Sequence, residues 1–300
     1  MSWRVVVIAS NAKVDYKMDC LVVRKTDGAS RIHLSEIGVL IVESTAVSIT
    51  AYALCELMRC KVKVIFCDHA RNPCAELVSA CGSHDTSAKI RQQIRWQQSA
   101  RQAVWTEIVR EKIRRQRDHL CLRKLPQAEL LSRYLGQLQL GDSTNREGHA
   151  AKVYFNALFG MEFSRSAALP VNAALNYGYS LILSALNREI SAAGYLNQLG
   201  IFHENTFNPF NLGCDFLEPL RPLVDAAVFD LSPTQLEREE KLFLVDLLNR
   251  EVLFDGRRQH LLYALRLYCA GLFRALQSGD LSEIRWIEYE LQTDESTGSF

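Results

Sequence analysis

The side chains best suited to chemistry lie in three short segments far apart in this 300-residue chain. The segments are 145–148 (NREG), 200–203 (GIFH) and 215–222 (DFLEPLRP). Glu147, His203 and Glu218 would together supply two carboxylates and one imidazole. This mixture of hard oxygen ligands with one nitrogen suits Mg²⁺ or Mn²⁺ better than a structural Zn²⁺ site. A site of that kind points to phosphate chemistry.

Two of these residues also have ordinary structural explanations. Glu147 starts an amphipathic helix that should end at Gly160, and an acid in the first helical turn is favoured by the helix dipole. His203 follows a Gly-Ile-Phe run in a loop that should pack against apolar neighbours. A neutral imidazole there is either a buried hydrogen-bonding group or a ligand.

The helix that contains Glu218 should kink at Pro219, because proline has no N–H to pair with the carbonyl of Asp215. A kinked helix with Asp215, Glu218 and Arg221 on one face can present carboxylates to a cleft. Arg221 then offers a fork of donors to a phosphate or a carboxylate. The alternative is an internal ion pair of Arg221 with Asp215 or Glu218, which would need no metal.

Positive charge is concentrated between Thr86 and Arg117, where nine Lys and Arg stand against two Glu, whereas the whole chain has a net charge of +1. The segment is interleaved with Trp96, Trp105 and glutamines, and it predicts one or two basic amphipathic helices. A solvated helix face is one explanation. Because matching acids are scarce, we favour neutralisation by the phosphates of a nucleic acid. The candidate contacts, including one outside the segment, are Arg91, Arg95, Lys112, Arg114, Arg115 and Arg221.

Hydrophobic patterning predicts an α+β fold, in which a small β-rich N-terminal domain precedes a larger all-helical domain. Strands are expected at 3–9, 19–25, 31–34, 37–42 and 61–67, with one helix capped by Ser44 or Thr45 and ending near Arg59. Helical periodicity then runs to about residue 291, and it includes a helix at 173–193 that Asn172 should cap and Gly194 should end. The predicted boundaries are 1–82 for the β-rich domain, 83–88 for a linker, 89–291 for the helical domain and 292–300 for a frayed tail.

Composition, with 48% hydrophobic and 23% charged residues, is that of a soluble globular protein. The N-terminus lacks the features of a secretory signal, and no apolar run reaches membrane-spanning length. Nine cysteines form an odd set without a CxxC pair, which favours a reducing cytosol and no membrane partner. Cys60, Cys67, Cys74 and Cys81 recur every seven residues, a spacing too wide for the usual zinc ligand pairs. Nucleophile-elbow, Walker and dinucleotide motifs are absent from the sequence.

Several ordered motifs resemble the CRISPR adaptation integrase family, that of the first Cas protein, and most of all its type II lineage. Over nearly the whole chain they agree at 66–73 (the end of the β-domain), 105–116 (a basic helix), 145–155 (the first metal motif), 172–179 (a supporting helix), 199–203 (the second metal motif) and 208–222 (the third).

The resemblance implies that Glu147, His203 and Glu218 are metal ligands in a catalytic helical domain. It also implies a homodimer that the β-rich domain forms, and a second Cas adaptation protein that bridges two dimers in the prokaryotic cytosol. The implied activity is transesterification, which joins the 3′-hydroxyl ends of short foreign DNA fragments to a CRISPR repeat. Phosphate contacts do not read sequence, so site choice would depend partly on DNA shape and partners.

The chain departs from the family pattern at two places. Glu204 replaces a second His that many relatives carry, and Gly213-Cys214 replaces an Ala-Asp pair. The first difference leaves open any His role in protonating the leaving oxygen, and Glu204 would add negative charge near the metal. Two alternatives stand beside the integrase: a stand-alone nuclease or transposon-type integrase, and a non-catalytic DNA-binding subunit in which the three residues form a structural network around Arg221.

Overall fold

Strand β5 (Ile37–Val42) is buried along its whole length because its two faces meet different hydrophobic cores. Val39 and Ile41 belong to the core that the helices build, whereas Leu40 and Val42 belong to a second core between two sheets. Successive side chains of a strand point to opposite faces. A strand covered on both faces therefore needs a continuous apolar run, and Ile-Gly-Val-Leu-Ile-Val supplies one.

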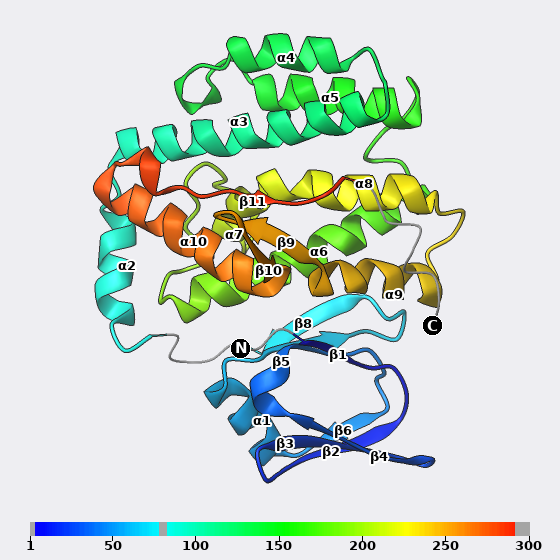
Figure 1. Ribbon diagram of the computed structural model, residues 1–300. Coiled ribbons are helices and arrows are strands. Elements are labelled where there is room, and N and C mark those ends of the chain that lie inside the picture. Colours follow the sequence, from blue (N-terminus) through cyan, green and yellow to red (C-terminus); the bar gives the residue numbers. More distant parts are fainter. Residues whose placement is uncertain (1–3, 78–82, 292–300) are drawn as a thin grey trace.

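The computed structural model describes residues 4–77 and 83–291. Its β-rich N-terminal region contains two stacked sheets (Figure 1). The first has the order β1 (Arg4–Ile8), β5, β7 (Lys63–Cys67), β8 (Pro73–Leu77), and only its β7–β8 pair is antiparallel. The second has the order β4 (Gly28–His33), β3 (Cys20–Lys25), β2 (Ala12–Lys17), β6 (Val47–Ile49), and only its β2–β6 pair is parallel. Helix α1 (Ala51–Arg59) packs against β2 and β7.

The start of α1 differs from the prediction. The cap is Thr50, whose hydroxyl accepts a hydrogen bond from the N–H of Ala53 at 3.2 Å. The predicted caps Ser44 and Thr45 lie too early, because residues 47–49 form β6 instead of a first helical turn. Strands β2, β6 and β8 were also not predicted.

The rest of the chain is mostly helical, which confirms the α+β class. Helix α3 lies centrally in this region and packs against α4, α5, α8 and α10 (Figure 1). The helices are α2 (Thr86–Ile94), α3 (Gln98–Leu122), α4 (Ala128–Gly136), α5 (Arg146–Phe159), α6 (Pro170–Ala192), α7 (Asn211–Leu217), α8 (Arg221–Leu231), α9 (Arg238–Asp246) and α10 (Leu261–Ser278).

The prediction that this region is all-helical is wrong near its end. Strands β9 (Glu251–Phe254), β10 (Arg257–His260) and β11 (Ile287–Glu288) form an antiparallel sheet in the order β10-β9-β11. Asp255 and Gly256 join β9 to β10 with positive φ values of 52° and 72°. Asp-Gly is a strong hairpin sequence because both turn residues tolerate that conformation.

Helix α6 also starts earlier than predicted, with Leu169 as cap and Pro170 in its first turn. The side chain of Asn172 instead donates to the carbonyls of Ser164 and Ala167, each at 2.8 Å, so the loop before the helix is tied to its first turn. Gly160 and Gly194 follow α5 and α6 in positive-φ conformations, as predicted.

Residues 78–82 and 292–300 lie outside the described residues, so the predicted boundary near 82 and the predicted tail remain predictions. Within 4–77 and 83–291, none of the helices is long and apolar enough to cross a membrane. The eight described cysteines are free thiols, and Cys81 lies outside the described residues.

Candidate active site

Glu147 is held by a capped helix N-terminus. The buried carboxylate of Asp142 accepts hydrogen bonds from the N–H groups of Arg146 and Glu147 at 2.7 and 3.0 Å. The side chain of Asn145 accepts from the N–H of Gly148 at 3.3 Å. These contacts satisfy donors that a helix start otherwise leaves unpaired. A Cβ on Gly148 would lie 2.8 Å from Asn145 Oδ1, so the glycine keeps the cap closed and fixes the backbone of Glu147.

His203 is held by Asp215, a side chain of α7 that is fully buried. Asp215 Oδ1 lies 2.7 Å from His203 Nδ1 and accepts from the N–H of His203 at 3.1 Å. Its Oδ2 accepts from the N–H groups of Ile201 and Phe202 at 2.6 and 3.2 Å. The hydrogen bond that His203 donates to Asp215 raises the pKa of His203, against the opposing effect of burial. An Nδ1–H that donates to Asp215 leaves the Nε2 lone pair available to a metal.

The loop that carries His203 also packs against Trp105 of α3. The ring of Phe202 stacks on Trp105 of α3 with centroids 4.2 Å apart, and Trp105 meets His203 edge-on at 5.8 Å. A Cβ on Gly200 would lie 2.3 Å from the His203 carbonyl oxygen and 2.7 Å from Asp215 Oδ2. The glycine of GIFH therefore allows the loop to wrap around the Asp215 carboxylate.

Glu218 lies at the predicted break in the helix. Helix α7 ends at Leu217, residues Glu218–Leu220 form one 3₁₀ turn, and α8 begins at Arg221. Glu218 is 4% exposed, and its Oε1 accepts from Arg221 Nε at 2.8 Å. The predicted ion pair of Arg221 with Glu218 is therefore present. Asp215 does not share a cleft with Glu218 as predicted, because its carboxylate turns to the 201–203 loop.

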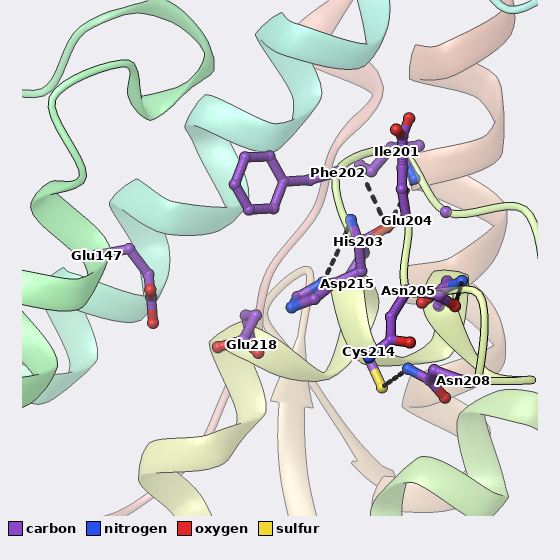
Figure 2. A network of polar contacts seen from close by, with 12 residues as sticks. Glu147, Ile201, Phe202, His203, Glu204, Asn205, Asn208, Cys214, Asp215 and Glu218 are labelled. Carbon is purple, nitrogen blue, oxygen red and sulfur yellow. Dashed lines mark hydrogen bonds and ion pairs between the residues drawn. The ribbon is translucent and has the colours of Figure 1, made fainter.

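Lys112 of α3 joins two of the predicted ligands. Its ammonium group donates to Glu147 Oε1 and to Glu218 Oε2. Burial alone would raise the pKa of Glu218, but Arg221 and Lys112 outweigh burial and lower that pKa to about 2. Glu218 is thus an ionised carboxylate inside the protein. Figure 2 shows the side chains of Glu147, Glu218 and His203 directed toward one region between α3, α5 and the α7–α8 junction.

The donor set of this region fits a hard divalent cation. Two carboxylates already converge on one buried positive charge, and the third predicted ligand, His203, is oriented by a carboxylate, as metal-binding imidazoles commonly are. In residues 4–77 and 83–291, no three His, Cys, Asp or Glu side chains form a ready metal-binding group. The Lys112 ammonium marks the position of positive charge between the two glutamates.

The basic segment forms two helices, as predicted, but its basic side chains differ in exposure and in their acidic partners. Arg91 of α2 and Arg95, which follows α2, are exposed, and Arg114 is half-buried beside Glu111 and Asp118. Arg221 retains 25% of its side-chain exposure at the site. These four remain candidate DNA contacts.

Two predicted DNA contacts are corrected by the structure. Arg115 is 6% exposed, pairs with Glu111 at 2.8 Å and donates to the Ile287 carbonyl at 2.9 Å, so it is part of the core. The ammonium group of Lys112 is buried and forms ion pairs with Glu147 and Glu218. The expectation that acids are scarce around the basic helix is wrong, because acidic side chains from other turns of α3 and from other elements form ion pairs with its basic side chains.

Two carboxylates and a carboxylate-oriented imidazole are side chains of the kind that metal-dependent phosphodiester enzymes use. The sequence matches the family model described as CRISPR associated protein Cas1 over residues 5–262. The chain therefore belongs to the Cas1 family.

Curated relatives support this assignment. A protein named CRISPR-associated endonuclease Cas1 from Neisseria meningitidis is 33% identical over 77% of this chain and 76% of its own length. A Pyrobaculum aerophilum protein named CRISPR-associated endonuclease Cas1 2 is 27% identical over 80% of this chain and 85% of its own. Family membership confirms the predicted class of protein, the integrase and endonuclease of CRISPR adaptation.

Solved structures share the fold. A casposase bound to integration product has a TM-score of 0.75 at 19% identity and covers 99% of this chain and 96% of its own. A CAS1 protein from Thermotoga maritima has a TM-score of 0.71 at 18% identity, over 92% of this chain and 97% of its own. At these identities the likeness concerns the fold alone.

Proposed function

We propose that Glu147, His203 and Glu218 bind Mg²⁺ or Mn²⁺, and that with this ion the protein joins 3′-hydroxyl ends of short foreign DNA fragments to a CRISPR repeat by transesterification. The observation that carries the proposal is the convergence of Glu147 and Glu218 on one buried cation beside a carboxylate-oriented histidine. A bound divalent ion would lower the pKa of the attacking hydroxyl and neutralise charge on the phosphate.

The chain's own residues prepare this chemistry. Asp215 holds the His203 ring and sets its tautomer, and the Asp142–Asn145 cap fixes the backbone from which Glu147 extends. Arg221, stacked over the ring of Tyr179 at 4.6 Å, keeps a guanidinium beside Glu218, where it can also face a phosphate oxygen. No protein nucleophile is required, because the DNA end supplies the attacking oxygen.

DNA and protein partners follow from the same proposal. Arg91, Arg95, Arg114 and Arg221 would contact the phosphates of the double-stranded fragment and repeat. The β-rich region would form the homodimer, and the second Cas adaptation protein would bridge two dimers in the cytoplasm. A solved structure that shares this fold is described as a Cas6-RT-Cas1–Cas2 complex, with a TM-score of 0.74 at 20% identity over 96% of this chain and 36% of its own.

The test is a joining assay with purified protein, its second Cas partner, a labelled duplex with 3′-hydroxyl ends and a repeat-bearing plasmid. We expect label to become covalently attached to the plasmid with Mn²⁺ and not with chelator. Glu147→Gln and Glu218→Gln should each abolish joining, whereas Glu129→Gln, a change of an exposed acid on α4, should not. Circular dichroism of each variant verifies folding. Joining by both site variants would refute the proposed ligands.

The products separate the alternatives. Shortened label without joining would indicate a stand-alone nuclease, in which water replaces the 3′-hydroxyl. DNA binding without any chemistry, and without specific Mn²⁺ binding, would indicate a non-catalytic subunit in which the same residues form only a structural network.

A further inference from the structure

The Lys112 ammonium occupies the space between two proposed metal ligands. The side chain of Lys112 extends from α3 and is 6% exposed, so its charge is almost completely removed from water. Its ammonium group donates to Glu218 and to Glu147, the two acids that lie against it. A buried charge of this kind persists only where partners satisfy it, and both partners here are proposed ligands.

Each carboxylate oxygen of Glu218 already faces a cation. Its Oε1 accepts from Arg221 and its Oε2 accepts from Lys112. A hard divalent ion binds carboxylate oxygens at about 2.0–2.6 Å, and an ammonium bound to the same oxygen would repel an ion at that distance because both are positively charged. An ion shared by Glu147 and Glu218 therefore competes with the ammonium of Lys112 for the same two carboxylates.

The Lys112 ammonium also has a role in the protein without a bound metal ion. Two ionised carboxylates that face each other inside a protein repel, and a bridging cation removes that repulsion. Lys112 and Arg221 together balance the charges of Glu147 and Glu218. A divalent ion that entered while both cations stayed in place would meet a neutral cluster instead of a negative one.

We propose that Lys112 is a positioning residue that holds Glu147 and Glu218 together in the metal-free protein and is displaced when the ion binds, so that it sets the affinity of the site. The inference rests on the proposed metal site. It predicts that a neutral side chain at position 112 destabilises the metal-free protein and tightens metal binding. If Lys112 had a purely structural role, its replacement would lower the stability of the protein without raising the metal affinity of the site.

The experiment measures Mn²⁺ affinity by electron paramagnetic resonance, and melting temperature in chelator, on the full chain. Lys112→Met should melt at a lower temperature in chelator and bind Mn²⁺ at least tenfold more tightly than the unchanged protein. We expect the same changes in melting temperature and Mn²⁺ affinity for Lys112→Gln, which keeps a hydrogen-bond donor. This variant replaces Lys112→Met in the experiment if Lys112→Met does not fold.

The matched control is Lys63→Met. Lys63 is also buried and pairs with a single acid, Glu76, in the β-rich region. This variant should lose stability with unchanged Mn²⁺ affinity.

Unchanged or weaker Mn²⁺ affinity in a folded Lys112 variant would overturn the inference, while the proposed function would stand if Glu218→Gln still abolished Mn²⁺ binding. If Glu218→Gln left Mn²⁺ binding intact, the proposed metal site itself would fail. In a further check on the unchanged protein, a crystal with Mn²⁺ bound should show the Lys112 ammonium away from Glu218 Oε2, and a retained contact would contradict displacement.

Discussion

Replacement of Asp215 by asparagine changes one atom of a fully buried side chain and should damage both stability and metal binding. The two carboxylate oxygens of Asp215 receive three backbone N–H groups and the Nδ1 of His203. An asparagine has one acceptor oxygen, so its NH₂ must face a pair of these donors. A buried donor left without an acceptor costs about 1–3 kcal/mol. Because one or two donors lose their partner, we expect the free energy of unfolding to fall by about 2–4 kcal/mol.

The effect on His203 follows from the same geometry. An NH₂ group at the Oδ1 position would donate to Nδ1 and force the proton onto Nε2, which could then no longer bind a metal. Loss of such a carboxylate partner commonly weakens metal affinity by about 10–100-fold. Urea unfolding in chelator and Mn²⁺ titration measure the two effects separately.

The matched control is Asp225→Asn on α8. Asp225 is equally buried, accepts a hydrogen bond from the hydroxyl of Tyr179, and has a pKa that burial raises to about 7. A neutral amide resembles a carboxyl group that is already partly protonated, and Tyr179 can still donate to it. The amide group would take the place of Oδ2, which is buried without a hydrogen-bond partner, so we expect a loss of about 1–3 kcal/mol with unchanged Mn²⁺ affinity. The reasoning is refuted if Asp215→Asn behaves like Asp225→Asn in both assays.

Three further predictions follow from burial and charge. Burial, with a smaller contribution from Arg123, lowers the pKa of His119 to about 4, so stability that is present above pH 6.5 is lost as the pH falls toward 4. Urea unfolding at pH 7.5 and 5 should differ by about 2 kcal/mol from this group, a difference that His119→Gln should remove. Glu204 pairs with Arg101 at 3.0 Å but is 75% exposed, so Glu204→Ala should change stability by less than about 0.5 kcal/mol and keep DNA joining, and a tenfold loss of joining would show a direct role. Arg115→Ala should destabilise by about 3 kcal/mol without weakening DNA binding, whereas Arg95→Ala should weaken DNA binding and reduce its salt dependence by about one ion with no loss of stability.

Local backbone chemistry made several elements predictable from the sequence. Gly160 and Gly194 end helices in conformations that other residues adopt with difficulty, and Pro219 interrupts the helix that carries Glu218 because it lacks an N–H. The hairpin at Asp255-Gly256 carried an equally clear sequence pattern, but it was not predicted because the two strands around it are short and the segments around them have helical periodicity.

Residues whose role depends on distant partners were not predictable in the same way. Asp215 lies three residues before Glu218, which suggested a shared helix face, but the loop at 201–203 captures its carboxylate. Lys112 and Arg115 lie among basic residues on α3, and sequence spacing does not reveal that acids from α5 and the α7–α8 junction meet Lys112. Net charge along the chain therefore overstated the positive surface.

The most direct test of the central claim is the position of Mn²⁺ found by anomalous scattering in crystals of the unchanged protein. The proposal predicts one strong peak within about 2.0–2.3 Å of a carboxylate oxygen of Glu147, a carboxylate oxygen of Glu218 and Nε2 of His203. A peak bound by other residues, or none at this position in protein that joins DNA with Mn²⁺, would contradict it.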